Sequence, residues 1–104
     1  MELYKVEFDS LAWETPMSGV RVKMVRNGNK QVRLAEFSSE FVETQWCEKG
    51  HIGFVLKGEL EIDFFGTIVR YTEGSGIFIP QGVTHGHKAR SVTPSVLLFL
   101  VEDV

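Results

Sequence analysis

Residues 74–85 read Gly-Ser-Gly-Ile-Phe-Ile-Pro-Gln-Gly-Val-Thr-His, a short apolar run followed by a sharp turn. Pro80 has a fixed φ and no backbone N–H, so it cannot continue a central strand of a sheet. Gly82 tolerates the positive φ that many tight turns require. The stretch therefore predicts one strand, a turn, and a second strand that brings His85 to the interior of the fold.

The sequence on either side of this stretch also predicts strands. In residues 59–64, acidic side chains at odd positions alternate with apolar side chains at even positions, so one face should be buried. Residues 20–24 and 31–34 alternate in the same way around Asn27-Gly28-Asn29, which predicts a β-hairpin. Further strands are predicted at 4–8, 41–47, 51–57, 67–72, 76–80, 84–89 and 95–101. About ten short strands with short connections are typical of an all-β sandwich or barrel.

The composition restricts the class of protein. The 104 residues carry 14 acidic and 11 basic side chains, a net charge of −3, and 43% of them are hydrophobic. This predicts one folded domain over residues 1–104 and no nucleic-acid partner. The longest apolar run near the end, 96–101, is too short to cross a bilayer, so no membrane partner is expected. The single cysteine, Cys47, excludes an internal disulfide. A single cysteine, together with the lack of a secretory signal at the start of the sequence, predicts a soluble protein of the reducing cytoplasm.

The last predicted strand, 95–101, is apolar on both faces. Such a strand either lies centrally between two layers or buries one face against a second subunit. The second alternative predicts a homodimer.

Several polar residues are expected on inward faces. Gln45 and Cys47 share one face of the strand predicted at 41–47, and His51 begins the next strand after a short turn. His85 and His87 share a face farther along the chain. Thiolate and imidazole ligate zinc, iron, nickel and copper, whereas an amide oxygen is a weaker neutral ligand. The alternatives are a cysteine that is only a small buried apolar residue, and histidines that are surface or hydrogen-bonded core residues.

Residues 74–85 fit the pattern Gly-x5-Pro-x-Gly-x2-His. This pattern resembles the second conserved motif of the cupin superfamily, with its four fixed positions at Gly74, Pro80, Gly82 and His85. The Asn that ends the family motif is replaced by Ala89. The resemblance covers about residues 36–100 and implies a small single-domain (type-2) cupin whose fold is a double-stranded β-helix, or jelly-roll barrel.

The first cupin motif reads Gly-x5-His-x-His-x3(or 4)-Glu-x6-Gly. When its last Gly is aligned on Gly58, its two His positions fall on Gln45 and Cys47, and its Glu position falls on His51. The resemblance therefore implies that Gln45, Cys47, His51 and His85 bind a divalent transition metal ion (zinc, iron, nickel or copper). The alternative is that metal binding is lost and only the barrel pocket remains. All three replacements are themselves potential ligands, which favours a retained metal.

The resemblance also implies a range of functions. The leading hypothesis is a metal-dependent enzyme that acts on a small polar molecule in the barrel mouth, as a dioxygenase, isomerase, decarboxylase or lyase. The alternatives are a non-enzymatic sensor or storage barrel that binds a small ligand or metal, and an interaction domain that uses the barrel as a scaffold. His87 is either an outer partner, proton shuttle or replacement ligand of the site, or a partly exposed polar residue. Glu43 is either an acid–base group or part of a salt bridge at the rim.

Overall fold

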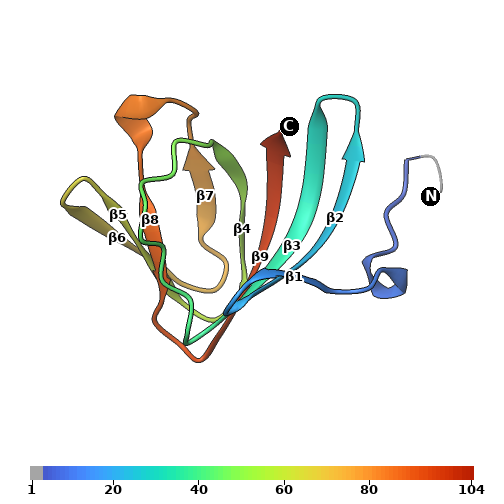
Figure 1. Cartoon of the computed structure of the whole chain (residues 1–104), viewed down its shortest axis with the longest axis horizontal. Helices are drawn as coiled ribbons and strands as arrows, with labels where there is room; N and C mark the ends of the chain where they lie inside the picture. The colour runs from blue at the N-terminus through green and yellow to red at the C-terminus, as the bar shows by residue number, and fades with distance from the viewer. Residues whose placement is uncertain (1–3) are drawn as a thin grey trace.

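Two antiparallel β-sheets face each other in the computed structural model, which describes residues 4–104 (Figure 1). The larger sheet has the strand order β1-β2-β3-β9-β4-β7, and the smaller has the order β6-β5-β8. The strands are β1 (Glu14–Met17), β2 (Val20–Asn27), β3 (Lys30–Ser38), β4 (His51–Lys57), β5 (Leu60–Phe64), β6 (Thr67–Tyr71), β7 (Gly76–Ile79), β8 (Lys88–Ser91) and β9 (Ser95–Asp103). Two short 3-10 helices, η1 (Phe8–Ser10) and η2 (Val83–His85), complete the described elements. The predicted all-β fold is confirmed.

The predicted hairpin is present and longer than the sequence pattern indicated. β2 and β3 pair from Val20 opposite Phe37 to Asn27 opposite Lys30, and Gly28 in the connecting turn has a φ of 62°. β9 then pairs with β3 on one side and with β4 on the other. The last strand of the chain therefore lies in the middle of the larger sheet.

The core fills the space between the two sheets. On β5, the even positions Leu60 and Ile62 are 1% and 4% exposed, which confirms the alternation predicted for residues 59–64. On β9, Val96, Leu98 and Leu100 face the same core. Burial of a side chain of this size contributes about 1.5–3 kcal/mol relative to its exposure. The same alternation places Glu102, the next even position, in the interior.

Two predicted strands are not formed, and of a third, predicted at 84–89, only residues 88–89 lie in a strand, since Val83–His85 form η2. Residues 41–47 pair with other segments only through isolated bridges, Val42 with Arg90 and Cys47 with His87. This segment therefore runs beside β8 in space but is not a regular pleated strand. Residues 4–8 form no strand: the Glu7 and Phe8 carbonyls accept from Ser10 N–H and Leu11 N–H in the turn of η1, and the Phe8 ring packs edge-on against Phe99. The edge strand β1, which contains a proline, was not predicted from the sequence.

The outer face of the larger sheet is apolar and partly open over β9, β4 and β7. Phe99 is covered in part by Phe8, whereas Ile52, Phe54 and Phe78 are 51%, 43% and 77% exposed. The homodimer expected from the apolar last strand stays a prediction, which sedimentation of the purified protein would test. Among residues 4–104, no helix has the length and apolar character needed to span a membrane.

Candidate metal centre

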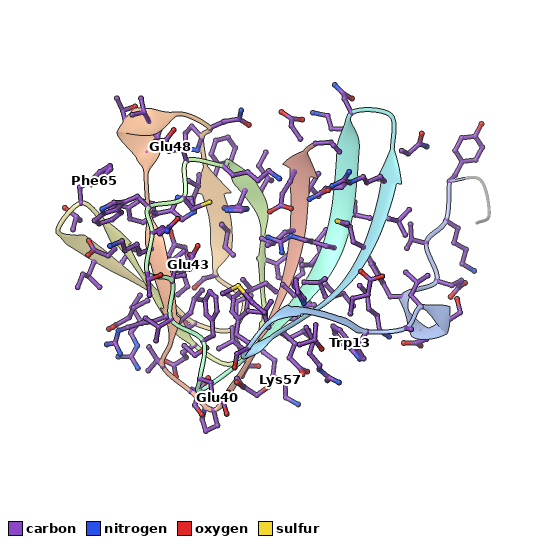
Figure 2. All side chains as sticks on the ribbon, in the orientation of Figure 1. Trp13, Glu40, Glu43, Glu48, Lys57 and Phe65 are labelled. Atoms are coloured by element: carbon purple, nitrogen blue, oxygen red, sulfur yellow. The ribbon has the colours of Figure 1, made fainter. Side chains whose placement is uncertain are left out.

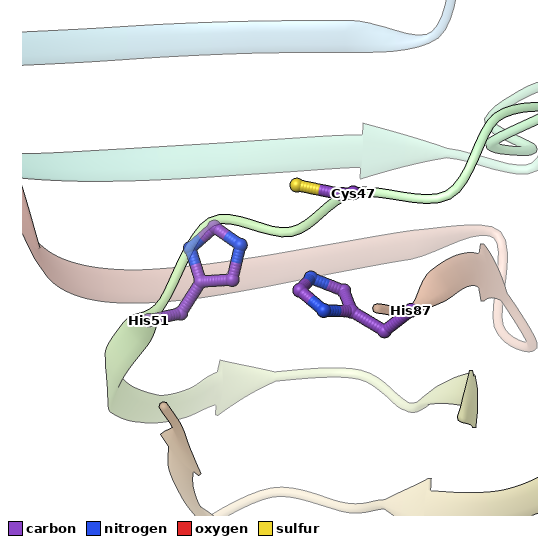
Figure 3. A group of neighbouring side chains, drawn as sticks. All are labelled: Cys47, His51 and His87. Atoms are coloured by element: carbon purple, nitrogen blue, oxygen red, sulfur yellow. The ribbon is translucent and has the colours of Figure 1, made fainter. Parts of the chain in front are cut away.

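Three potential metal ligands meet between the two sheets. The ligand atoms of Cys47, His51 and His87 all lie within 4.8 Å of one another. Cys47 lies in the loop before β4, His51 is the first residue of β4, and His87 directly precedes β8 (Figure 3). One thiol and two imidazoles form a donor set that suits zinc, iron, nickel or copper, and not magnesium or calcium.

The backbone holds Cys47 and His87 together. The Cys47 N–H donates to the His87 carbonyl at 2.8 Å, and the His87 N–H donates to the Cys47 carbonyl at 2.9 Å. Such a doubly hydrogen-bonded antiparallel pair fixes the relative position of two residues that are far apart in sequence. The two side chains are therefore placed by main-chain geometry.

His51 is oriented by a buried carboxylate. Its Nδ1 hydrogen-bonds to Oε2 of Glu102, whose side chain has no exposed surface. The same carboxylate accepts hydrogen bonds from Arg33, through Nε at 2.7 Å and Nη2 at 2.9 Å, and from Gln31 Nε2 at 2.8 Å. With Nδ1 engaged in this way, Nε2 of His51 is the nitrogen left to bind a metal ion.

His87 is oriented in the same way by a main-chain oxygen. Its Nδ1 lies 3.1 Å from the carbonyl oxygen of His85, a distance at which a protonated Nδ1 donates a hydrogen bond. The neutral ring then carries its proton on Nδ1 and keeps the lone pair on Nε2 free. Both imidazoles thus have the arrangement found in histidine metal ligands, in which the second nitrogen is hydrogen-bonded to an oxygen.

The cluster changes the protonation of its members. The imidazoles of His51 and His87 beside the sulfur lower the pKa of Cys47 to about 5. Burial by itself would lower the pKa of each imidazole. However, Cys47 beside both rings, together with Glu102 beside His51, raises both pKa values above the usual range. The lowered pKa of Cys47 favours the thiolate, which is the form of cysteine that binds metal.

The cluster lines a cavity of about 240 Å³ between the sheets. Glu43 lines it as well, and its Oε1 accepts a hydrogen bond of 2.9 Å from the Ala89 N–H (Figure 2). Burial raises the pKa of Glu43. Arg33 and Lys49 add two cationic side chains, and most of the remaining wall is apolar.

Comparison with known proteins places the chain in a family. Residues 39–101 match the family model of the cupin domain. The chain belongs to the cupin family. No curated protein sequence matches the chain.

Solved structures confirm the cupin fold. KdgF from Halomonas sp. is 22% identical with a TM-score of 0.76, over 91% of this chain and 89% of that protein. An RmlC-like cupin from Shewanella frigidimarina is 15% identical with a TM-score of 0.78, over 98% and 91% of the two chains. A mutant oxalate decarboxylase from Bacillus subtilis is 16% identical with a TM-score of 0.73, over 94% of this chain and 28% of the enzyme. The two facing sheets of this cupin are thus a jelly-roll barrel.

The structure brings two of the four expected ligands of this cupin together. Cys47 and His51 lie in the cluster, but Gln45 and His85 are exposed and do not line the cavity. Gln45 does not share a face with Cys47 because residues 41–47 are not a pleated strand. His85 ends η2, so the turn after Pro80 delivers His87, which is 2% exposed, to the interior.

The ion pair of the partly buried Arg33 with the buried Glu102 was missed from the sequence. Glu102 had a signal, because the alternation of buried residues at 96, 98 and 100 continues to position 102. Arg33 gave no comparable signal. It alternates with apolar residues as a solvent-facing side chain does, and only its position opposite β9 places it against Glu102.

A strained hairpin supports the backbone beside two cluster residues. Phe65, at the tip of the β5–β6 hairpin, has a φ of 53°, an uncommon conformation for a bulky residue (Figure 2). Its ring lies 4.4 Å from the Trp46 ring, centroid to centroid. It also covers Gly86, where an added Cβ would lie 2.6 Å from Phe65 Cζ. Trp46 and Gly86 directly precede Cys47 and His87.

Gly86→Ala should displace the Phe65 ring from Trp46 and lower the free energy of unfolding by about 1 kcal/mol, the value of an aromatic pair. Urea unfolding would measure the change. Gly76→Ala is the matched control, because its added Cβ would meet no atom within 4 Å, and we expect a change of less than about 0.5 kcal/mol. Equal effects of the two substitutions would contradict the packing role of Phe65.

Proposed function

We propose that this cupin binds one divalent transition metal ion through Cys47, His51 and His87, and that the bound ion serves a metal-dependent enzyme. The observation that carries the proposal is the paired orientation of the two imidazoles. Each has its Nδ1 against an oxygen acceptor, and each leaves Nε2 free beside a cysteine of lowered pKa. A histidine that only fills the core does not need its Nδ1 against an oxygen and its Nε2 free, and here both rings have this arrangement.

Three protein ligands favour an enzyme over a closed storage or structural site. Structural zinc sites use four protein ligands, whereas catalytic sites keep a position for water or substrate. Gln45, the expected fourth ligand, is exposed and outside the cavity wall. A metal ion bound here would polarise a carbonyl or carboxylate oxygen of a small molecule. Glu43, which lines the same cavity with a raised pKa, is suited to hold or transfer a proton there.

Cobalt substitution tests the metal site directly. We expect the purified protein to bind about one equivalent of Co²⁺ and to develop the near-ultraviolet band of thiolate-to-cobalt charge transfer. Because Cys47 is the only cysteine in the sequence, this band has one possible source. Cys47→Ser should remove the band while the circular dichroism spectrum stays that of the wild type. A folded wild-type protein that binds neither Co²⁺ nor Zn²⁺ would refute the metal site.

The same sample distinguishes an enzyme from a closed site. An open coordination position should accept azide, and the visible bands of bound Co²⁺ should then shift. Bands that stay unchanged at saturating azide would indicate a closed site and would favour the non-enzymatic storage or sensor barrel.

A further inference from the structure

The walls of the cavity restrict the kind of molecule that fits. Phe37 on β3, Leu98 on β9 and Ile62 on β5 line it from both sheets. Phe41 stacks on Phe37 with the ring centroids 4.1 Å apart and the planes within 12°, and both aromatic side chains line the cavity. A hydroxyl group placed against such walls would lose its hydrogen bonds to water without replacement. The bound molecule must therefore have a hydrocarbon body.

The polar part of the cavity carries an unused donor. Glu102 occupies Nε and Nη2 of Arg33 and also hydrogen-bonds to His51, so the guanidinium lies beside a proposed metal ligand. No hydrogen bond to the remaining nitrogen, Nη1, is present within residues 4–104, and the Arg33 side chain is 22% exposed and lines the cavity. Lys49 adds a second positive charge to the same wall.

These two features fit one ligand chemistry. We infer that the cavity binds a small monocarboxylate with a compact hydrocarbon body, one carboxylate oxygen ligating the metal ion and the other accepting a hydrogen bond from Arg33 Nη1. This inference rests on the proposed metal site and narrows the small polar molecule expected from the sequence to an amphipathic acid. The volume of about 240 Å³ lies below that of pockets for drug-sized molecules and limits the body to about one ring.

Three probe molecules separate the contributions of head and body. Benzoate has both the carboxylate and the ring, benzyl alcohol keeps the ring without the charge, and gluconate keeps the carboxylate on a body of hydroxyl groups. Titration calorimetry on the Co²⁺-loaded protein should show benzoate binding at least about tenfold more tightly than either of the others. Benzoate should also shift the visible bands of the bound Co²⁺.

A substitution tests the role of Arg33 separately. Arg33→Lys keeps the positive charge but removes the planar group that can bind Glu102 and a ligand together, and should weaken benzoate binding about tenfold. It should leave the binding of benzyl alcohol unchanged. Arg21→Lys is the matched control, because Arg21 pairs with Glu36 on the neighbouring strand at the surface and does not line the cavity. If Arg33→Lys does not fold, the three-probe comparison on the wild type decides by itself.

The outcomes distinguish this inference from the metal site beneath it. If Co²⁺ does not bind, the metal site is wrong and the ligand inference falls with it. If Co²⁺ binds through Cys47 but gluconate equals or exceeds benzoate, or no probe binds, the metal site stands and the ligand class is wrong. Benzoate binding that leaves the cobalt bands unchanged would also overturn the inference.

Discussion

His87→Ala should lower the affinity for Co²⁺ or Zn²⁺ at least about 100-fold, whereas His85→Ala should change it by less than about twofold. The loss of an outer partner of a metal ligand already costs about 10–100-fold in affinity, so the loss of the ligand itself should cost more. His87 is 2% exposed and belongs to the cluster, but the His85 side chain is exposed. His85 contributes its carbonyl oxygen to His87, and alanine keeps that oxygen.

The comparison of these two variants is informative because the two histidines are only two residues apart. His85 occupies the histidine position of the cupin motif, and His87 does not. Competition with a chromophoric chelator would measure the affinities, and circular dichroism would show that both variants are folded. A larger loss with His85→Ala than with His87→Ala would support the ligand set expected from the motif and overturn the one proposed from the structure.

Glu102→Gln should lower the free energy of unfolding by about 3–5 kcal/mol, although glutamine has nearly the same shape. The substitution leaves the Arg33 guanidinium half-buried without its carboxylate, and an uncompensated charge in the interior is costly. Burial by itself would raise the pKa of Glu102, but the hydrogen bonds from His51 and Arg33 hold the pKa well below its usual range. The native carboxylate is therefore ionised at neutral pH, and glutamine removes that charge.

The same substitution should reduce metal affinity about 10–100-fold, because it turns one of the two acceptor oxygens into an NH2 donor and removes the negative charge beside Nδ1 of His51, which fix the orientation of its ring. Asp103→Asn is the matched control on the adjacent residue. Asp103 pairs with Lys30 at the surface, where both side chains are more than half exposed, and exposed pairs contribute about 0–1 kcal/mol. Urea unfolding and chelator competition would measure both effects. Similar losses for the two variants would show that Glu102 has no special role.

The sequence predicted the parts of this fold that depend on local patterns. The alternation around Asn27-Gly28-Asn29 and in residues 59–64 specified a hairpin and a half-buried strand, and both are present. The spacing of Cys47 and His51 was enough to bring them together, since only a short turn separates them. These features require no knowledge of which strands are neighbours.

The remaining features depend on contacts that a local pattern cannot specify. Strand alternation would place His85 and His87 on the same face. In the structure, a single turn of 3-10 helix at Val83–His85 leaves only His87 facing the cavity. The pairing of Arg33 with Glu102 joins residues 69 positions apart through the register of β3 and β9. The sequence suggests that Glu102 points inward, but it does not identify the cation that neutralises it.

The central position of β9 also sets the order in which the molecule can be assembled. β9 lies between β3 and β4 and pairs with both. Without β9, the strands β1-β2-β3 and the pair β4-β7 are therefore not hydrogen-bonded to each other. During synthesis from the N-terminus, Cys47, His51 and His87 leave the ribosome before residues 95–103 do. The hairpin can form early, but His51 gains its carboxylate partner only when β9 inserts. Completion of the proposed metal centre is therefore coupled to closure of the larger sheet, and long-range pairing of this kind is generally slow.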